Sequence, residues 1–270
     1  MNRILLEGGE IGADGTAVLS GPRAAHVRDV LRARVGDGVR VGAMDGPVGT
    51  ARVLEVAAER VRLAVTLDAE APPPRADLLL AVPRPKVLRR LWSQLAALGV
   101  GRIVLLNAGR VESCYFHTHW LRESEYRPLL VEGLSQAGTT RLPEVRVRRR
   151  FRPFVEDELD ALFPTRWRLL AHPGPATAVP VPGRVALPRD RERVPRPLLA
   201  VGPEGGWTDY EIEQLLARGF APFSLGERVL RSDTACVALL AVLGHAVEAA
   251  TGARASPRGA ARGSRAAPGR

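Results

Sequence analysis

The sequence predicts an α/β protein, a mostly parallel sheet with helices on both faces, preceded by a small β-barrel. Two observations lead to this fold class. After residue 76, short apolar runs alternate with helical segments, which is typical of a parallel sheet covered on both sides. Before residue 70, short runs of strand-forming residues are broken by Gly and Asp turns. The segment EAPPPRAD (70–77) lies between them, and its three prolines indicate a stiff, extended spacer.

The first predicted domain spans residues 1–70. Its predicted strands are RILLEG (3–8), TAVLS (16–20) and a set of short strands within 35–67. Between them, GPRAAHVRDVLRAR (21–34) has helical spacing, so a small barrel that carries one helix fits. The predicted apolar face of this helix consists of Ala25, Val27, Val30 and Leu31. The arginines on and just after the helix fit either a solvated basic face or a surface that contacts RNA.

The second predicted domain spans residues 71–251. Its predicted strands are 77–85, 101–107, 166–174 and 197–206. Its predicted helices are 86–100, 119–138 with an interruption near Pro128, 153–163, 208–220 and 232–250. In such a sheet, ligands bind beyond the carboxyl ends of the strands, and the glycine turns of this chain lie at those ends. The remaining residues, 252–270, are rich in Arg, Gly, Ala, Ser and Pro, which predicts a disordered basic tail.

Composition limits the classes of function. Hydrophobic residues make up 46% of the 270 residues, which supports a real core, and no apolar run approaches the ~20 residues of a membrane span. The N-terminus becomes acidic and glycine-rich too early for a signal peptide, and two cysteines make no disulfide framework, so we expect a cytoplasmic protein without a membrane partner. The net charge of +10 favours a polyanionic partner, although the tail's five arginines supply half of it.

The stretch GPEGG (202–206) follows an apolar strand directly. It is neither the GxGxxG motif of dinucleotide-binding proteins nor a phosphate-binding P-loop, because no Gly-Lys-Ser/Thr follows. Thr208 and Glu211 have the spacing of a capping box, so a helix begins there. The five residues between are a backbone-lined turn, which fits either a tight strand-to-helix connection or a ligand. Two further strand-terminal loops, LLAHPGP (169–175) and SLGERVLR (224–231), favour the ligand.

Together these motifs resemble the RsmE family of 16S ribosomal RNA uridine methyltransferases. The specific segments are GPEGG-x-T-x-x-E and, after it, LG-x-R-x-LR-x-[acid]-TA; HVRDVLRARVGD (26–37) and VEGLSQAGTTRLPEV (131–145) support them. The resemblance implies a C-terminal SPOUT-type trefoil-knotted sheet, a PUA-like RNA-binding barrel and S-adenosylmethionine as cofactor. It also implies a homodimer that methylates N3 of a uridine in the 16S rRNA of the small ribosomal subunit. The chain departs from the family pattern at Gln94, Ala97 and Asp233.

The resemblance also implies the site residues. A loop cluster offers backbone N–H and C=O groups to an adenine edge, which needs close approach and therefore glycine. The predicted cofactor-binding residues are Leu170, Ala171, His172, Val201, Gly202, Pro203, Glu204, Gly205, Gly206, Leu225, Gly226, Val229, Leu230 and Thr234. Since the N3 of uracil carries a proton at neutral pH, methyl transfer requires that this proton is removed or the developing anion is stabilised. We expect the Arg231 guanidinium to stabilise the anion and Glu204 either to accept the proton or to orient the loop.

The predicted RNA-contacting residues are His26, Arg28, Arg32, Arg34, Lys86, Arg110, Gln136 and Arg141. No metal is expected, since Cys114, His117 and His119 lack a fourth ligand and ordinary zinc spacing. A non-catalytic RNA-binding or ribosome-assembly factor with a relic cofactor pocket is the main alternative function. A doubly wound nucleotide-binding protein is a weaker alternative, because the chain has neither GxGxxG nor a phosphate-binding lysine.

Overall fold

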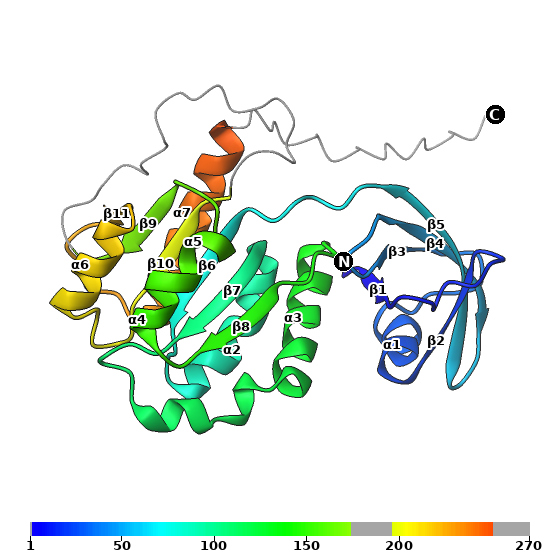
Figure 1. Cartoon of the computed structure of the whole chain (residues 1–270). Coiled ribbons are helices and arrows are strands. Elements are labelled where there is room, and N and C mark those ends of the chain that lie inside the picture. The colour runs from blue at the N-terminus through cyan, green and yellow to red at the C-terminus, as the bar shows by residue number, and fades with distance from the viewer. Residues whose placement is uncertain (1, 174–195, 251–270) are drawn as a thin grey trace, which may run out of the picture.

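A computed structural model describes residues 2–173 and 196–250 of the chain. They form two sheets, of five and six strands (Figure 1). The extended segment 70–75 connects the last strand of the first sheet to the first strand of the second (Figure 1). The predicted tail, 252–270, lies outside the described residues.

The N-terminal sheet is mixed and open. Its elements are β1 (Ile4–Leu6), β2 (Thr16–Ser20), α1 (Gly21–Ala25), η1 (His26–Val30), β3 (Gly38–Ala43), β4 (Val48–Val56) and β5 (Arg60–Ala69). Its order is β1-β3-β4-β5-β2, parallel between β1 and β3 and antiparallel elsewhere. Within the described residues β1 and β2 do not pair, so the strands curl around their own apolar cluster without closing the predicted barrel. Instead, β1 lies next to α3, where Arg3 N donates to Ser135 O at 2.9 Å.

The predicted apolar face of the N-terminal helix is wrong in part. Val27 is fully buried, but the Val30 side chain is 66% exposed. The reason is a π-helical turn, in which Leu31 N donates to His26 O, five residues back. The extra residue in this turn rotates the following side chains away from the face that a regular 3.6-residue period would bury.

The second sheet is all parallel, with the order β11-β9-β10-β6-β7-β8. Its strands are β6 (Ala76–Ala81), β7 (Val100–Leu106), β8 (Glu144–Arg148), β9 (Arg168–Ala171), β10 (Leu198–Val201) and β11 (Phe220–Phe223). The predicted parallel α/β architecture is confirmed. The sequence analysis missed β8 and β11, which are the two edge strands. β8 alternates charged residues with valine, and β11 is only four residues long and contains Pro222, a residue that sheets accept mainly at edges.

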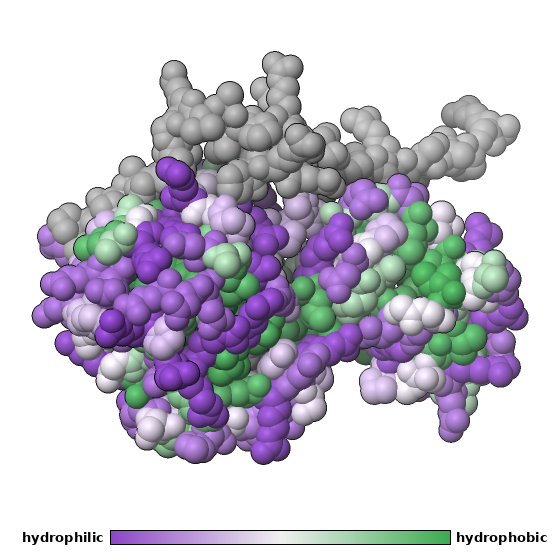
Figure 2. Space-filling model, in the orientation of Figure 1, coloured by the Kyte–Doolittle hydropathy of each residue, from purple (hydrophilic) through white to green (hydrophobic). Residues whose placement is uncertain are grey.

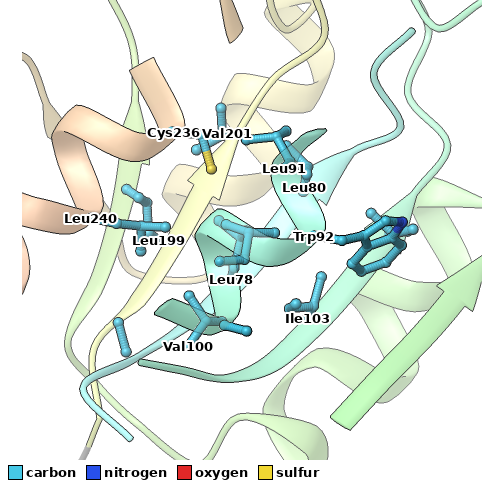
Figure 3. Packing of buried hydrophobic residues seen from close by; sticks show 14 of the residues in the cluster. Leu78, Leu80, Leu91, Trp92, Val100, Ile103, Leu199, Val201, Cys236 and Leu240 are labelled. Atoms are coloured by element: carbon cyan, nitrogen blue, oxygen red, sulfur yellow. The ribbon is translucent and has the colours of Figure 1, made fainter. Parts of the chain in front are cut away.

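Helices cover both faces of this sheet. They are α2 (Pro85–Ala97), α3 (Glu123–Ala137), α4 (Phe151–Pro153), α5 (Leu159–Leu162), α6 (Asp209–Ala217) and α7 (Ser232–Ala250), with shorter turns η2 (Ser113–His117), η3 (His119–Leu121) and η4 (Phe154–Glu158). Leu78 and Leu80 of β6 face the cluster under α2, α3 and α7, whereas Leu79 faces the cluster under η4, α5 and α6. Figure 3 shows the first cluster, in which Cys236 is fully buried as expected of a core thiol.

Among the described helices, only α7 is long and apolar enough to cross a membrane by length and composition. A core helix of a soluble protein passes the same test. Cys236, Leu239, Leu240 and Leu243 of α7 are buried against the sheet, so this side of the helix belongs to the core.

The predicted interruption of α3 at Pro128 does not occur. The helix runs continuously from Glu123 to Ala137, because the missing N–H of Pro128 removes only one bond of the helical ladder. Contact with α2 supports it. At Gly133 a Cβ atom would lie 2.0 Å from the backbone oxygen of Ser93, so only glycine permits this close crossing of the two helices.

The N-terminal sheet contacts the loop after α3 through hydrogen bonds and close packing. Asp45 N donates to Thr140 O at 2.9 Å, and the Thr140 hydroxyl donates to the Gly46 carbonyl at 2.6 Å. At Gly42, a Cβ would lie 2.5 Å from the Thr140 methyl group. Hydrogen bonds and close packing therefore join the two sheets at this point, beyond the extended connection alone.

Candidate functional site

A cavity of about 240 Å³ opens at the carboxyl ends of β9, β10 and β11, on the side of the sheet that α7 covers. Three loops and the start of α7 enclose it. The lining residues are Ala171, His172, Pro173, Val201, Gly202, Pro203, Glu204, Gly205, Gly206, Trp207, Phe223, Ser224, Leu225, Gly226, Arg228, Val229, Leu230, Ser232, Ala235 and Leu239. The three loops are the ones that the sequence analysis singled out.

The glycines of the first turn are explained largely by the chain itself. A Cβ at Gly202 would lie 3.1 Å from the Trp207 indole ring, and one at Gly205 would lie 3.2 Å from Cδ of Arg110. Gly206 has a φ of +73°, which side chains rarely adopt. The sequence pattern favours a ligand as the reason for these glycines. The structure places Trp207 against Gly202 and Arg110 against Gly205, and Trp207 also lines the cavity.

Arg110 was predicted to contact RNA. In the structure its Nη1 atom donates to the carbonyl oxygens of Gly205 at 2.7 Å and Trp207 at 3.1 Å. The guanidinium therefore satisfies backbone acceptors of the turn, which fixes the turn's shape. Sequence analysis had no means to find this contact, because Arg110 and Gly205 lie 95 positions apart.

The predicted capping box at the start of α6 is confirmed in both halves. The Thr208 hydroxyl accepts from Glu211 N at 3.3 Å, and Glu211 Oε2 accepts from Thr208 N at 2.8 Å. The second oxygen of the same carboxylate accepts from Gly109 N at 2.7 Å. Glu211 is 3% exposed, so one buried carboxylate joins the start of α6 to the loop after β7.

Replacing Glu211 by alanine is expected to lower the free energy of unfolding by about 2–3 kcal/mol. The substitution leaves the backbone N–H groups of Gly109 and Thr208 without their acceptor, and hydrogen bonds to charged groups contribute about 1.5–3 kcal/mol. Urea unfolding followed by circular dichroism measures this change. Glu213→Ala removes an exposed carboxylate from the same helix and is the matched control, expected to lie within about 0.5 kcal/mol of the parent. An equal loss in both variants would contradict this role of Glu211.

The loop after β11 has the features of a ligand cradle. Gly226 has a φ of +123°, and the Ser224 hydroxyl accepts from Gly226 N at 3.1 Å, which holds the loop open over the cavity. Three apolar side chains at its rim are exposed: Leu225 by 40%, Val229 by 82% and Leu230 by 39%. An apolar rim beside backbone polar groups fits an adenine ring and its hydrogen-bonding edge. The residues present therefore fit S-adenosylmethionine.

A second group of polar residues borders the turn. Glu204 Oε1 accepts from the backbone N–H of Arg84, the residue that precedes α2, at 3.0 Å. Burial raises the pKa of the Tyr115 hydroxyl, and its hydrogen bond to Glu112 at 2.8 Å raises this pKa further. The neighbouring Tyr115 hydroxyl is also the main cause of a raised pKa at Arg84, with Glu204 contributing. Glu204 thus has a structural contact that ties the turn to the start of α2.

The structure brings all but two of the predicted cofactor residues to the cavity lining. Leu170 is 1% exposed and packs in the cluster under α5 and α6, because neighbouring residues of a strand face opposite sides of the sheet. Thr234 is exposed on α7 and does not line the cavity. The α7 side chains that do are Ser232, Ala235 and Leu239, whose spacing places them on one helix face.

Several lining residues were not predicted: Pro173, Trp207, Phe223, Ser224, Arg228, Ser232, Ala235 and Leu239. The helical spacing of the last three was the one signal that could have found them.

Arg228 and Arg231 differ in position. Arg228 lines the cavity, whereas Arg231 is exposed just outside it, and its carbonyl accepts from Ala235 N at 2.8 Å. Neither arginine forms a side-chain hydrogen bond or ion pair within residues 2–173 and 196–250.

Most predicted RNA-contacting residues lie far from the cavity. Arg28 is paired with Asp29 at 2.7 Å, and Arg141 donates to the Asp45 carbonyl at 2.7 Å. Gln136 donates weakly to Glu132, at 3.4 Å. His26 is half-buried, and its Nε2 atom has no hydrogen-bond partner. Of the predicted RNA-contacting residues, Arg32, Arg34 and Lys86 are exposed and have no side-chain hydrogen bond or ion pair in the described part of the chain.

Cys114, His117 and His119 lie in the segment between β7 and α3. Cys114 Sγ lies 3.8 Å from Glu112, and the His119 ring contacts the Trp120 ring at a tilt of 45°, with ring centroids 4.3 Å apart. Among the described residues, no cluster of three or more His, Cys, Asp or Glu side chains has a metal-binding arrangement.

Comparisons with known proteins agree with this geometry. Residues 70–244 match the family model of the RNA methyltransferase domain. A relative named ribosomal RNA small subunit methyltransferase E, from Treponema pallidum, is 31% identical over 91% of this chain and 92% of its own. A Synechocystis protein of the same name is 28% identical over 87% of this chain and 75% of its own.

Solved structures give the same result for the fold. Ribosomal RNA small subunit methyltransferase E from Neisseria gonorrhoeae, bound to S-adenosyl methionine, has a TM-score of 0.68 at 22% identity and covers 91% of this chain and 98% of its own. A putative methyltransferase from Legionella pneumophila, in complex with the same cofactor, has a TM-score of 0.67 at 26% identity, over 90% and 97%.

Proposed function

The chain belongs to the RNA methyltransferase family that includes ribosomal RNA small subunit methyltransferase E, and we propose that it methylates N3 of a uridine in the 16S rRNA. The methyl donor is S-adenosylmethionine. The observation that carries the proposal is the cavity at the carboxyl ends of β9, β10 and β11, where backbone groups of two glycine loops lie beside an exposed apolar rim. The departures at Gln94 and Ala97 lie on the exposed side of α2, outside the cavity lining, which supports an enzyme over a relic pocket.

The cofactor, when bound, supplies an electrophilic methyl group, and the chain's own residues prepare the acceptor. The loop backbone at Gly202 and Gly226 would hold the adenine edge, and Leu225, Val229 and Leu230 would pack against its ring. Arg231 stabilises negative charge on the uracil oxygens as N3 loses its proton, because a guanidinium stays charged at any working pH. Glu204 is the carboxylate among the described residues that line the cavity and is the candidate acceptor of that proton, although one of its oxygens already accepts from Arg84 N.

We further propose the finer features that the family resemblance implies. Residues 1–70 act as a PUA-like RNA-binding domain, 71–251 as a SPOUT domain whose chain threads a trefoil knot, and 252–270 as a basic tail. A homodimer built on α7 fits the exposure of Val242, 39%, on a helix that is apolar around much of its circumference. The partner's residues then complete each active site. A cytoplasmic location and 16S rRNA in the small subunit as partner follow from the same assignment.

The test is mass spectrometry of nucleosides from small-subunit particles that lack the modification, after incubation with the purified chain and S-adenosylmethionine. We expect N3-methyluridine to form, and calorimetry to detect binding of the cofactor. Cofactor binding without any methylated nucleoside would favour the non-catalytic factor with a relic pocket. Methylation at another atom of the RNA would overturn the proposed specificity while leaving the enzyme class intact.

A further inference from the structure

Two more hollows open at the carboxyl ends of strands in the six-stranded sheet, as the cavity does. One is lined by the residues that follow β7 and β8 and by the start of α6; the other is lined by η2, the segment before α3 and the end of β8. Arg149 lines both, so the two hollows are neighbours. The first of these hollows is the one nearer to the candidate cofactor cavity. Trp207 lines that cavity and Thr208 lines the nearer hollow, so consecutive residues border the two. The Trp207 ring also contacts Phe151 of the hollow, with ring centroids 6.1 Å apart.

The side chains of the nearer hollow combine positive charge with an open aromatic ring. Arg149, Arg150 and Arg152 are exposed there, and Tyr210 at the start of α6 is 47% exposed. Arg152 pairs with Glu156 at 2.8 Å, whereas Arg150 has no side-chain partner among the described residues. Side chains over α4 and α6, which border this hollow, are mostly hydrophilic (Figure 2).

The acidic residue of the hollow does not cancel this charge. Glu211 also lines it, but its carboxylate is buried and accepts from the backbone N–H groups of Gly109 and Thr208. Of the two remaining arginines, Arg150 is exposed and unpaired among the described residues, whereas Arg149 is exposed and makes a long hydrogen bond of 3.4 Å to the Phe116 carbonyl, with its guanidinium 5.2 Å from the centroid of the Phe116 ring. Arginines with an exposed aromatic ring are the combination that binds single-stranded nucleic acid, since the ring stacks on a base and the guanidinium groups hold phosphates.

We propose that these two hollows form a binding track for the single-stranded RNA next to the target uridine, with one base stacked on Tyr210 and phosphates held by Arg149 and Arg150. The inference rests on the proposed function. The N3 atom of uridine is on its base-pairing edge, so the target base must be unpaired and turned out of any stack before it reacts. Its neighbours along the strand are then unstacked as well, and a track that begins beside Trp207 is placed to receive them.

The test measures binding of a fluorescein-labelled single-stranded oligouridylate by fluorescence anisotropy across a salt series. Tyr210→Ala is expected to weaken binding about tenfold, because the stacked base loses its platform, while Tyr210→Phe keeps the ring and nearly full affinity. Arg150→Ala is expected to reduce the slope of log affinity against log salt by roughly 0.7, which corresponds to one phosphate contact. Arg166→Ala removes an exposed arginine from the opposite, amino end of the sheet and is the matched control, with little change expected.

Cofactor affinity of every variant, measured by calorimetry, should equal that of the parent and shows that the fold is intact. Unchanged oligouridylate binding by both Tyr210→Ala and Arg150→Ala would overturn the track. Weaker binding to small-subunit particles with unchanged oligouridylate binding would also overturn it, since a ribosomal protein would then occupy the surface. If the parent chain forms no N3-methyluridine but the binding losses occur, the proposed function fails and the track stands. If it methylates normally and the losses do not occur, only the track fails.

Discussion

Arg231→Ala is expected to slow methyl transfer by about 10²–10³ while leaving the affinity for S-adenosylmethionine nearly unchanged. The backbone of Arg231 is held by the first turn of α7, through its carbonyl bond to Ala235 N, whereas its side chain is exposed beside the cavity. Truncation therefore removes the guanidinium without disturbing the loop. Single-turnover methylation of small-subunit particles, with calorimetry of the cofactor, separates the two effects.

Arg228→Ala is the matched control. Arg228 lies three residues earlier on the same loop and lines the cavity, so its loss should weaken cofactor binding more than the chemical step. Arg231→Lys should recover part of the rate, because an ammonium group cannot reproduce a two-pronged contact with the uracil oxygens. Equal losses of rate and cofactor affinity in Arg231→Ala would make Arg231 a cofactor ligand instead. A full rate would mean that another group stabilises the anion.

Trp92→Ala is expected to lower the free energy of unfolding by about 3–5 kcal/mol, a large share of the 5–15 kcal/mol typical of a domain. Trp92 is completely buried in α2, its ring lies 4.8 Å from that of Tyr126 on α3, and its indole N–H donates to the Trp120 carbonyl at 3.2 Å. Truncation leaves a cavity between the two helices and leaves the Trp120 carbonyl without its donor. Urea unfolding followed by circular dichroism gives the change.

Two variants of the same helix test whether burial is the cause. Trp92→Phe keeps most of the volume and loses only the hydrogen bond and part of the packing, so we expect a cost of about 1–2 kcal/mol. Gln94→Ala, at an exposed position two residues away, should change stability by less than about 0.5 kcal/mol. A loss below 1 kcal/mol in Trp92→Ala would show that the space between α2 and α3 collapses freely around the missing ring.

The interior of the fold was predictable because central parallel strands carry unbroken apolar runs. LLLA in β6 and IVLL in β7 can be recognised without any knowledge of their neighbours. The edge strands were not predictable in this way. EVRVR of β8 alternates charge with valine, and FAPF of β11 is four residues long with a proline, so each becomes a strand only because a finished neighbour offers it a hydrogen-bonding edge.

In the candidate site, too, features with a local sequence signal were predictable, and features that depend on neighbouring segments were not. Its loops were predictable, because glycine turns at strand ends are local signals. The lining of the cavity was not fully predictable, since it depends on which face of a strand or helix meets the loops, as the cases of Leu170 and Thr234 show. Contacts between distant segments, such as Arg110 with the carbonyl of Gly205, have no local signal at all.

The junction at Thr140 fixes the separation between the N-terminal sheet and the C-terminal sheet. Gly42 has no room for a side chain there, and Asp45 is bonded to the same loop, so the N-terminal sheet is not free to swing on the proline spacer. An RNA that touches both parts must then present its two contact points at one fixed separation. Folded RNA in a particle can meet that demand with no further ordering, whereas a flexible strand must first lose conformational freedom. The junction thus favours binding of folded RNA over binding of a flexible strand that has the same nucleotide sequence.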